Sequence, residues 1–110
     1  MPPTRLIRIA DRLAEIVGGS RAADDIIHKT LNRDGPVFPY SRNDGAARLL
    51  LPAGFEWRDP TYSCGMVYAS CRHIGLHKGQ PYAPHGQCAA TLALAMCGAA
   101  LRAHVSLGRG

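Results

Sequence analysis

The stretch that decides the fold is "ATLALAMCGAALRAHV", residues 90–105, which consists mostly of Ala and Leu and contains one charged residue, Arg102. The uncharged segment Cys88–Leu101 is 14 residues long, whereas a helix that crosses a bilayer needs about 20 residues. A signal peptide does not fit either, because the segment comes late in the sequence. We therefore predict a buried helix of a globular domain, covered on most of its sides by neighbouring elements.

Three further helices are predicted before this segment. Apolar residues in "TRLIRIADRLAEIVGG" (residues 4–19) recur at helical spacing and give way to two glycines, which are typical of a helix end. Ser20 is the expected N-cap of "RAADDIIHKTL", residues 21–31. Ser41 is the expected cap of a short helix over residues 42–51, because the sequence after it approximates a capping box.

The middle of the sequence predicts strands. "GFEWRD" (residues 54–59) alternates apolar and polar residues, and "YSCGMVYASCRHI" (residues 62–74) resumes as one strand in which Gly65 weakens the pairing or marks a bulge. "GLHKGQPYAPHGQ" (residues 75–87) predicts a mobile loop, because it is rich in Gly and Pro. We expect an α+β fold with a small antiparallel sheet of about three strands, flanked by helices on both faces as an α/β/α sandwich. One such domain accounts for residues 1–110.

Charge is distributed unevenly along the sequence. The formal net charge is +5, and all 8 acidic residues lie at or before Asp59. The later part carries only cationic and neutral side chains, a pattern that favours an anionic partner. It does not specify nucleic acid, because no predicted helix has a dense Lys/Arg face and no groove-reading motif is present.

Two segments resemble a known family. "PYSRNDGAARLLLPAGFEW" (residues 39–57) and "TLALAMCGAALRA" (residues 91–103) are similar to the opening and the closing helix of the phage ABA-sandwich domain family, and "GGSRAADDIIHKTL" (residues 18–31) resembles the helix that often precedes them. This sequence has Leu92 where the family commonly has Pro, which leaves open an earlier helix start, near Gln87 or Cys88. The resemblance implies a phage or prophage origin and a sheet flanked by helices, and it implies no catalytic residues.

Histidines and cysteines suggest two alternatives. His73, His77, His85 and Cys88 are all of types that bind zinc, although their spacing does not reproduce a zinc finger. Cys71 lies two residues before His73, so both side chains would point to the same side of a strand, and a histidine can activate a neighbouring thiol. A zinc-binding protein and a Cys/His enzyme therefore stay as alternatives to the main prediction, which is a protein without catalysis and without a cofactor.

A set of aromatic and cationic side chains follows the predicted strands. Aromatic rings stack on bases, Arg and Lys bind phosphates, and a mobile loop can close over a ligand. The expected ligand-binding residues are Trp57, Arg58, Tyr68, Arg72, His73, His77 and Lys78.

The resemblance and the charge pattern together predict a small protein that acts by binding in the cytoplasm of an infected bacterial cell. The expected role is counter-defence, through capture of an anionic, nucleotide-type signal or through blocking of a host defence protein. No association with a membrane is expected. An accessory role in phage assembly is a further alternative, and an open edge of the small sheet would permit a homodimer.

Overall fold

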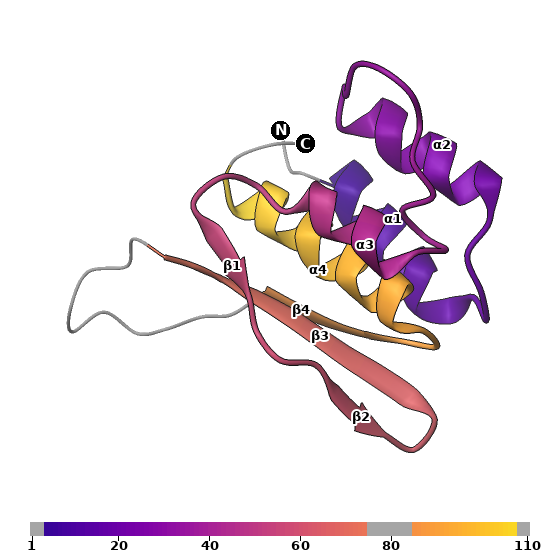
Figure 1. The fold of residues 1–110 in the computed structure, drawn as a ribbon, viewed down its shortest axis with the longest axis vertical. Helices are drawn as coiled ribbons and strands as arrows, with labels where there is room; N and C mark the ends of the chain where they lie inside the picture. Colours follow the sequence, from indigo (N-terminus) through magenta and orange to yellow (C-terminus); the bar gives the residue numbers. More distant parts are fainter. Residues whose placement is uncertain (1–3, 75–84, 108–110) are drawn as a thin grey trace.

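The structure, a computed structural model, describes residues 4–74 and 85–107. In these ranges an antiparallel sheet packs against a layer of helices, which confirms the predicted α+β class (Figure 1). The helices are α1 (Thr4–Glu15), α2 (Arg21–Thr30), α3 (Asp44–Ala47), the 3₁₀ helix η1 (Arg48–Leu50) and α4 (Leu92–Ser106). The strands are β1 (Phe55–Trp57), β2 (Thr61–Ser63), β3 (Met66–His73) and β4 (His85–Ala89).

Helix α4 lies at the centre of the molecule, as its composition predicts. It begins at Leu92, because the Thr91 side chain caps it by accepting a hydrogen bond from the backbone N–H of Leu94 at 3.2 Å. Cys88, the alternative start, belongs to strand β4. The sheet covers one side of α4, while α1 and α3 cover others. Within the two described ranges, no helix combines the length and apolar character needed to cross a bilayer.

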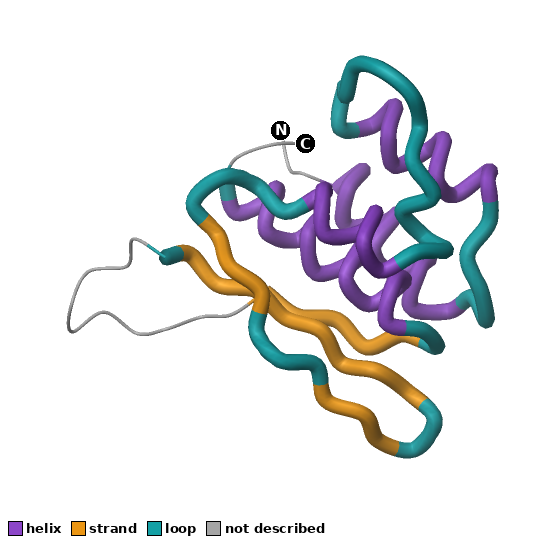
Figure 2. The backbone as a smooth tube through the Cα atoms, viewed as in Figure 1, coloured by secondary structure: helices purple, strands orange, loops and turns teal. Residues whose placement is uncertain are grey.

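The sheet is arranged around β3, which pairs antiparallel with each of the other three strands (Figure 2). Val67 and Tyr68 pair with both β2 and β4, and Cys71 pairs with both β1 and β4. A residue has one neighbour on each side, so β1 and β2 lie one after the other along the same edge of β3. The sheet is thus three strands wide, close to the expected size.

The described helices lie over one face of the sheet. Val67, Ala69 and Cys71 of β3 are buried on this face, whereas Tyr68 and Arg72 alternate to the other face and are exposed. Both α1 and α3 pack on α4, and α1 also reaches β4. The sequence predicts helices on both faces of the sheet. The described helices instead form one layer over one face, in which α1 and α3 cover the sides of α4 that the sheet does not.

Two parts of the strand prediction are corrected. Residues 62–74 form a hairpin rather than one strand, because Cys64 (φ 51°) and Gly65 (φ 74°) form a tight turn between β2 and β3. The expected loop over residues 75–87 ends in strand β4, whose pairing with β3 is a long-range contact. Residues 75–84 of that predicted loop lie outside the described residues.

The helix caps agree with the prediction at one position and differ at another. Ser20 caps α2 as predicted, since its hydroxyl accepts a backbone N–H from the first turn at 3.1 Å. Ser41 does not cap α3; Asn43 does, through its side-chain oxygen. Ser41 instead donates to the carboxylate of Asp24, and this bond ties the start of α2 to the segment before α3.

Candidate functional site

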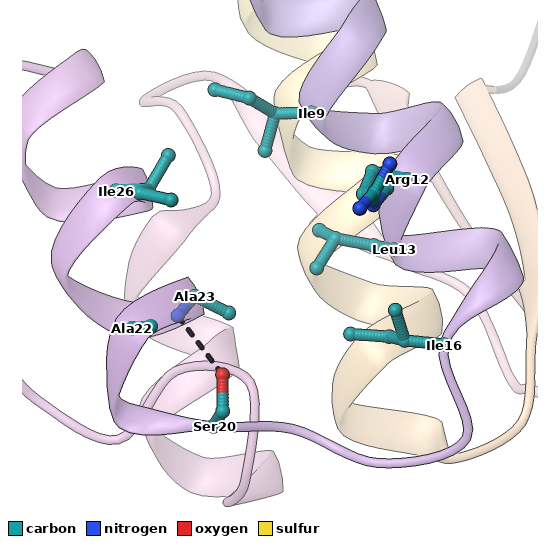
Figure 3. A pocket seen from close by; sticks show the side chains of 8 residues that line it. All are labelled: Ile9, Arg12, Leu13, Ile16, Ser20, Ala22, Ala23 and Ile26. Atoms are coloured by element: carbon teal, nitrogen blue, oxygen red, sulfur yellow. Dashed lines mark hydrogen bonds between the residues drawn. The ribbon is translucent and has the colours of Figure 1, made fainter.

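An apolar groove separates α1 from α2 (Figure 3). It has a volume of about 310 Å³, at the lower end of the range for ligand pockets. Ile26 projects from α2 toward the α1 side chains and is 51% exposed, an unusually large fraction for an isoleucine that faces another helix. The groove is lined by Ile9, Arg12, Leu13 and Ile16 on one side and by Ser20, Ala22, Ala23 and Ile26 on the other.

The groove stays open because α2 is attached to the molecule at a different place. Helix α1 packs closely on α4, but α2 does not pack closely on α1. A Cβ added to Gly19, in the link between the two helices, would lie 1.9 Å from the backbone oxygen of Ser41. The link therefore runs against the segment before α3, which positions α2 beside α1 without closing the space between them.

A buried polar network holds α2 in this position. Asp24 is fully buried, and its Oδ1 accepts hydrogen bonds from the backbone N–H of Ser41 at 2.7 Å and from the Ser41 hydroxyl at 2.5 Å. Its Oδ2 pairs with the guanidinium of Arg42 at 2.9 Å. One turn later on α2, His28 Nδ1 lies 2.8 Å from the hydroxyl of buried Tyr40. These bonds hold α2 to the segment that precedes α3.

Cationic side chains border the groove. Arg12 lines it, and Arg5 lies one turn before Ile9 on the same side of α1. On α2, the exposed Lys29 lies three residues after Ile26. None of the residues that line the groove is acidic. In the described part of the chain, no salt bridge joins Arg12 or Lys29 to a carboxylate.

Three of the predicted ligand residues come together elsewhere. Trp57, Arg58 and Arg72 line a shallow depression of about 350 Å³ at the end of β1, together with Glu56 and Asp59. Arg72 donates a hydrogen bond to Glu56, its partner across the β1–β3 ladder. The two guanidiniums thus share the depression with two carboxylates, so it offers no net positive charge to a polyanionic ligand.

The other predicted ligand residues do not join this group. Tyr68 lies on the opposite face of the sheet from Trp57, and its hydroxyl covers Gly86, where a Cβ would lie 2.0 Å away. His73 lies at the other end of β1, with its ring 5.1 Å from that of Phe55. His77 and Lys78 lie outside the described residues. The structure therefore does not gather the seven residues into one site.

The zinc alternative loses its geometric basis. His85 and Cys88 both lie on β4, three positions apart, so their side chains point to opposite faces of the sheet. His85 lies beside Phe55, with ring centroids 5.9 Å apart, and burial lowers the pKa of its imidazole. His77, the fourth member, lies outside the described residues. Within the described ranges, no three His, Cys, Asp or Glu side chains come together as a metal site.

The thiol alternative is disfavoured by the surroundings of Cys71. Its side chain is fully buried beneath α4, with Sγ 3.8 Å from the backbone oxygen of Ala99. Burial raises the pKa of this thiol to about 11. A nucleophilic cysteine needs the opposite shift, since the thiolate is the reactive form. His73, the expected activating residue, is exposed at the end of β3.

Comparison of the chain with protein-family models, with curated proteins and with solved structures finds no match. The resemblance of residues 18–31, 39–57 and 91–103 to the phage ABA-sandwich family therefore stays a prediction. The assignment of a site depends on the geometry described above.

The sequence pattern predicts the two helices but not the groove between them. Helical spacing predicts which apolar residues of α1 and α2 share a face, but not what covers that face. One signal was available. Ile26 and Ile27 are adjacent, so they point in different directions from α2; Ile27 is fully buried and Ile26 faces the groove.

Proposed function

We propose that the protein acts by binding, and that its partner presents an amphipathic helix with an apolar face and acidic flanks to the groove between α1 and α2. The observation that carries the proposal is the open apolar groove itself, in which two helices face each other without close backbone packing. Exposed apolar surface rimmed by polar residues is typical of interaction sites.

The dimensions of the groove support a helical occupant. Ile9 and Leu13 lie four residues apart on α1, about 6 Å along its axis, and Ile16 directly follows the last residue of the helix. A partner helix repeats its apolar side chains at the same spacing, so a row of them can lie between α1 and α2. Ile26 then becomes covered, which makes it the expected centre of the contact.

The charges around the groove support the acidic flanks. Arg12 lies within the groove and Lys29 lies beside it, with no carboxylate among the lining residues. An acidic partner would be attracted to this surface, and a basic one repelled. The overall net charge of +5 has the same sign as this local charge.

The test uses a synthetic helical peptide as the probe. It carries Leu at i, i+3, i+4 and i+7 and Glu on both flanks, and a matched peptide has Lys in place of Glu. We expect the acidic peptide to shift the methyl NMR signals of Ile9, Ile16 and Ile26 in a saturable way. Ile26→Ser should weaken this binding at least tenfold, which corresponds to about 1.4 kcal/mol.

Two controls make the outcome decisive. Val17→Ser removes an apolar side chain that is 89% exposed but does not line the groove, and this variant should bind like the original protein. Equal binding of the Glu and Lys peptides would contradict the charge argument. Absence of shifts at the three isoleucines, or self-association of the protein through this groove in analytical ultracentrifugation, would reject the partner helix.

We further propose which protein carries this helix: a host defence protein that the chain blocks in the cytoplasm of an infected bacterium. It is supported by the resemblance to phage proteins, together with a surface suited to binding. Bacteria that carry a defence system and express this protein should become sensitive to phage, whereas bacteria that express Ile26→Ser should stay resistant. Equal sensitivity with both proteins would show that the groove does not serve this role.

A further inference from the structure

A second, much smaller cavity lies beside Trp57, at the junction of β1, η1 and the start of α4. Its volume is about 30 Å³, enough for one group the size of a water molecule. It is lined mainly by Arg48, Trp57, Arg58, Pro60, Leu92 and Met96. The exposed side chains of Arg48 and Arg58 place it at the surface of the molecule.

Trp57 has an unsatisfied hydrogen-bond donor. Its Nε1 is buried, and it is the single buried side-chain nitrogen or oxygen without a hydrogen-bond partner in the described part of the protein. An indole N–H donates and cannot accept, so the group that completes it must be an acceptor. Buried donors without a partner are rare in native proteins, which makes this atom informative.

The charge around the cavity indicates the kind of acceptor. Two arginines, Arg48 and Arg58, line it, and no acidic residue does. Among the described residues, no salt bridge neutralises Arg48. Leu92 and Met96 make the inner wall apolar, so that an oxygen bound there would be shielded from water.

We propose that this cavity is an oxyanion site, in which one oxygen of a phosphoryl or carboxylate group accepts the hydrogen bond from Trp57 Nε1. The remaining oxygens face the guanidiniums of Arg48 and Arg58. The cavity admits a single oxygen, so the rest of the ligand lies outside it, at the surface where Arg48 and Arg58 are exposed. This site is separate from the groove between α1 and α2 and does not depend on the function proposed there.

The sequence offers a direct reporter, because Trp57 is the only tryptophan. The protein therefore gives one indole N–H signal in a ¹H–¹⁵N spectrum. Inorganic phosphate and acetate are added in separate titrations, with chloride at equal ionic strength as the control. We expect a saturable shift of the indole signal with phosphate, with acetate or with both, and the responding anion identifies a phosphoryl or a carboxylate ligand.

The variants decide whether the shift reports this cavity. Arg48→Gln and Arg58→Gln should each weaken anion binding at least tenfold, whereas Arg21→Gln, which removes the same charge from α2 outside the cavity lining, should leave binding unchanged. If neither anion shifts the indole signal beyond the chloride control, the cavity holds water and the proposal is overturned. An unchanged affinity in both Gln variants would overturn it as well.

Discussion

Asp24 shows how one side chain can position a whole helix. It is fully buried, although Asp is rarely buried without a partner, and its two oxygens accept hydrogen bonds from Ser41 and Arg42. The network joins α2 to a segment that lies far from it in sequence. One wall of the groove therefore depends on these bonds.

Replacing Asp24 should destabilise the protein. In Asp24→Ala the buried backbone N–H of Ser41 loses its acceptor and Arg42 loses its partner, so the free energy of unfolding should fall by about 2 kcal/mol. Chemical denaturation measures the change. The control is Asp25→Ala at the exposed neighbouring position, which should stay within about 0.5 kcal/mol. Similar losses in both variants would show that the network adds no specific stability.

The four cysteines should differ sharply in reactivity. Cys64 and Cys88 are exposed, whereas Cys71 and Cys97 are buried. Burial raises the pKa of Cys71 to about 11, and burial together with the charge of Asp24 raises the pKa of Cys97. Both buried thiols therefore stay protonated at neutral pH and should not react.

A disulfide reagent that releases a coloured thiolate counts the accessible thiols. The native protein should show two fast-reacting thiols and the denatured protein four, in line with the two exposed and two buried cysteines. Cys71→Ala should leave the native count unchanged. Reaction of Cys71 at the rate of Cys64 would restore the thiol alternative that its burial argues against.

At the scale of elements, the turn between β2 and β3 fixes the shape of the sheet. Cys64 and Gly65 both have positive φ, at 51° and 74°, and join the paired residues Ser63 and Met66. A two-residue turn of this kind favours Asn followed by Gly, and Cys at its first position carries a steric cost.

Improving this turn should stabilise the protein. Cys64→Asn should raise the free energy of unfolding by about 0.5 kcal/mol or more, because Asn tolerates the left-handed region better than Cys does. Gly65→Val should lower it by at least about 1 kcal/mol. Thermal unfolding measures both. If residues 62–74 formed one continuous strand instead, Gly65→Val would favour the strand and would not destabilise it.

At Gly98, α4 lies close against the Gln87 side chain of β4. A Cβ at this position would lie 2.1 Å from Nε2 of Gln87. The buried Gln87 side chain cannot easily move away, because it donates to the backbone oxygen of Ala10 and accepts a hydrogen bond from Arg102 at 2.9 Å. Helices α1 and α4 therefore both contact the side chain of Gln87, which belongs to strand β4.

Gly98→Ala should therefore destabilise the protein by about 1–2 kcal/mol, although alanine is the better helix former. Gly18→Ala is the control, since nothing lies within 4 Å of its added Cβ. A double-mutant cycle with Gln87→Ala separates the steric cause from a general effect on the helix. Purely additive effects in that cycle would contradict the proposed clash.

The sequence predicts best the features that depend on local patterns. The cap at Ser20 and the burial of α4 follow from residue types within a few positions of each other. The role of Ser41 could not be predicted, because its partner Asp24 is distant in the sequence and either Ser41 or Asn43 can cap a helix. Strand β4 could not be predicted either, because His85, Gly86 and Gln87 have little strand preference. Their extended conformation depends on pairing with β3, which is distant in the sequence.

The candidate sites depend even more on tertiary structure. Trp57 and Arg58 were predicted as ligand residues from their own segment, but Arg48, the second guanidinium at the small cavity, comes from η1. The groove arises because α2 is held by the Asp24 network beside α1 rather than packed on it. Helical spacing identifies the apolar faces of the two helices and contains no information on the distance between them.

At the scale of the whole molecule, the sheet, α1 and α3 all pack on α4. The sheet packs on one of its sides and α1 and α3 on others, so the wall that α1 gives to the groove is only as stable as its packing on α4 (Figure 1). Cores of this kind open only with global unfolding, whereas peripheral elements open more easily. Since α2 lacks close packing on α1, it should be among the elements that open first.

Amide hydrogen exchange followed by NMR tests this arrangement most directly. The account predicts that the amides of Leu94–Leu101 exchange slowest of all, with a free energy equal to that of global unfolding, and that those of α2 exchange faster. If the α4 amides exchanged as fast as those of α2, α4 would not be the buried centre, and both proposed binding sites would lose their structural basis.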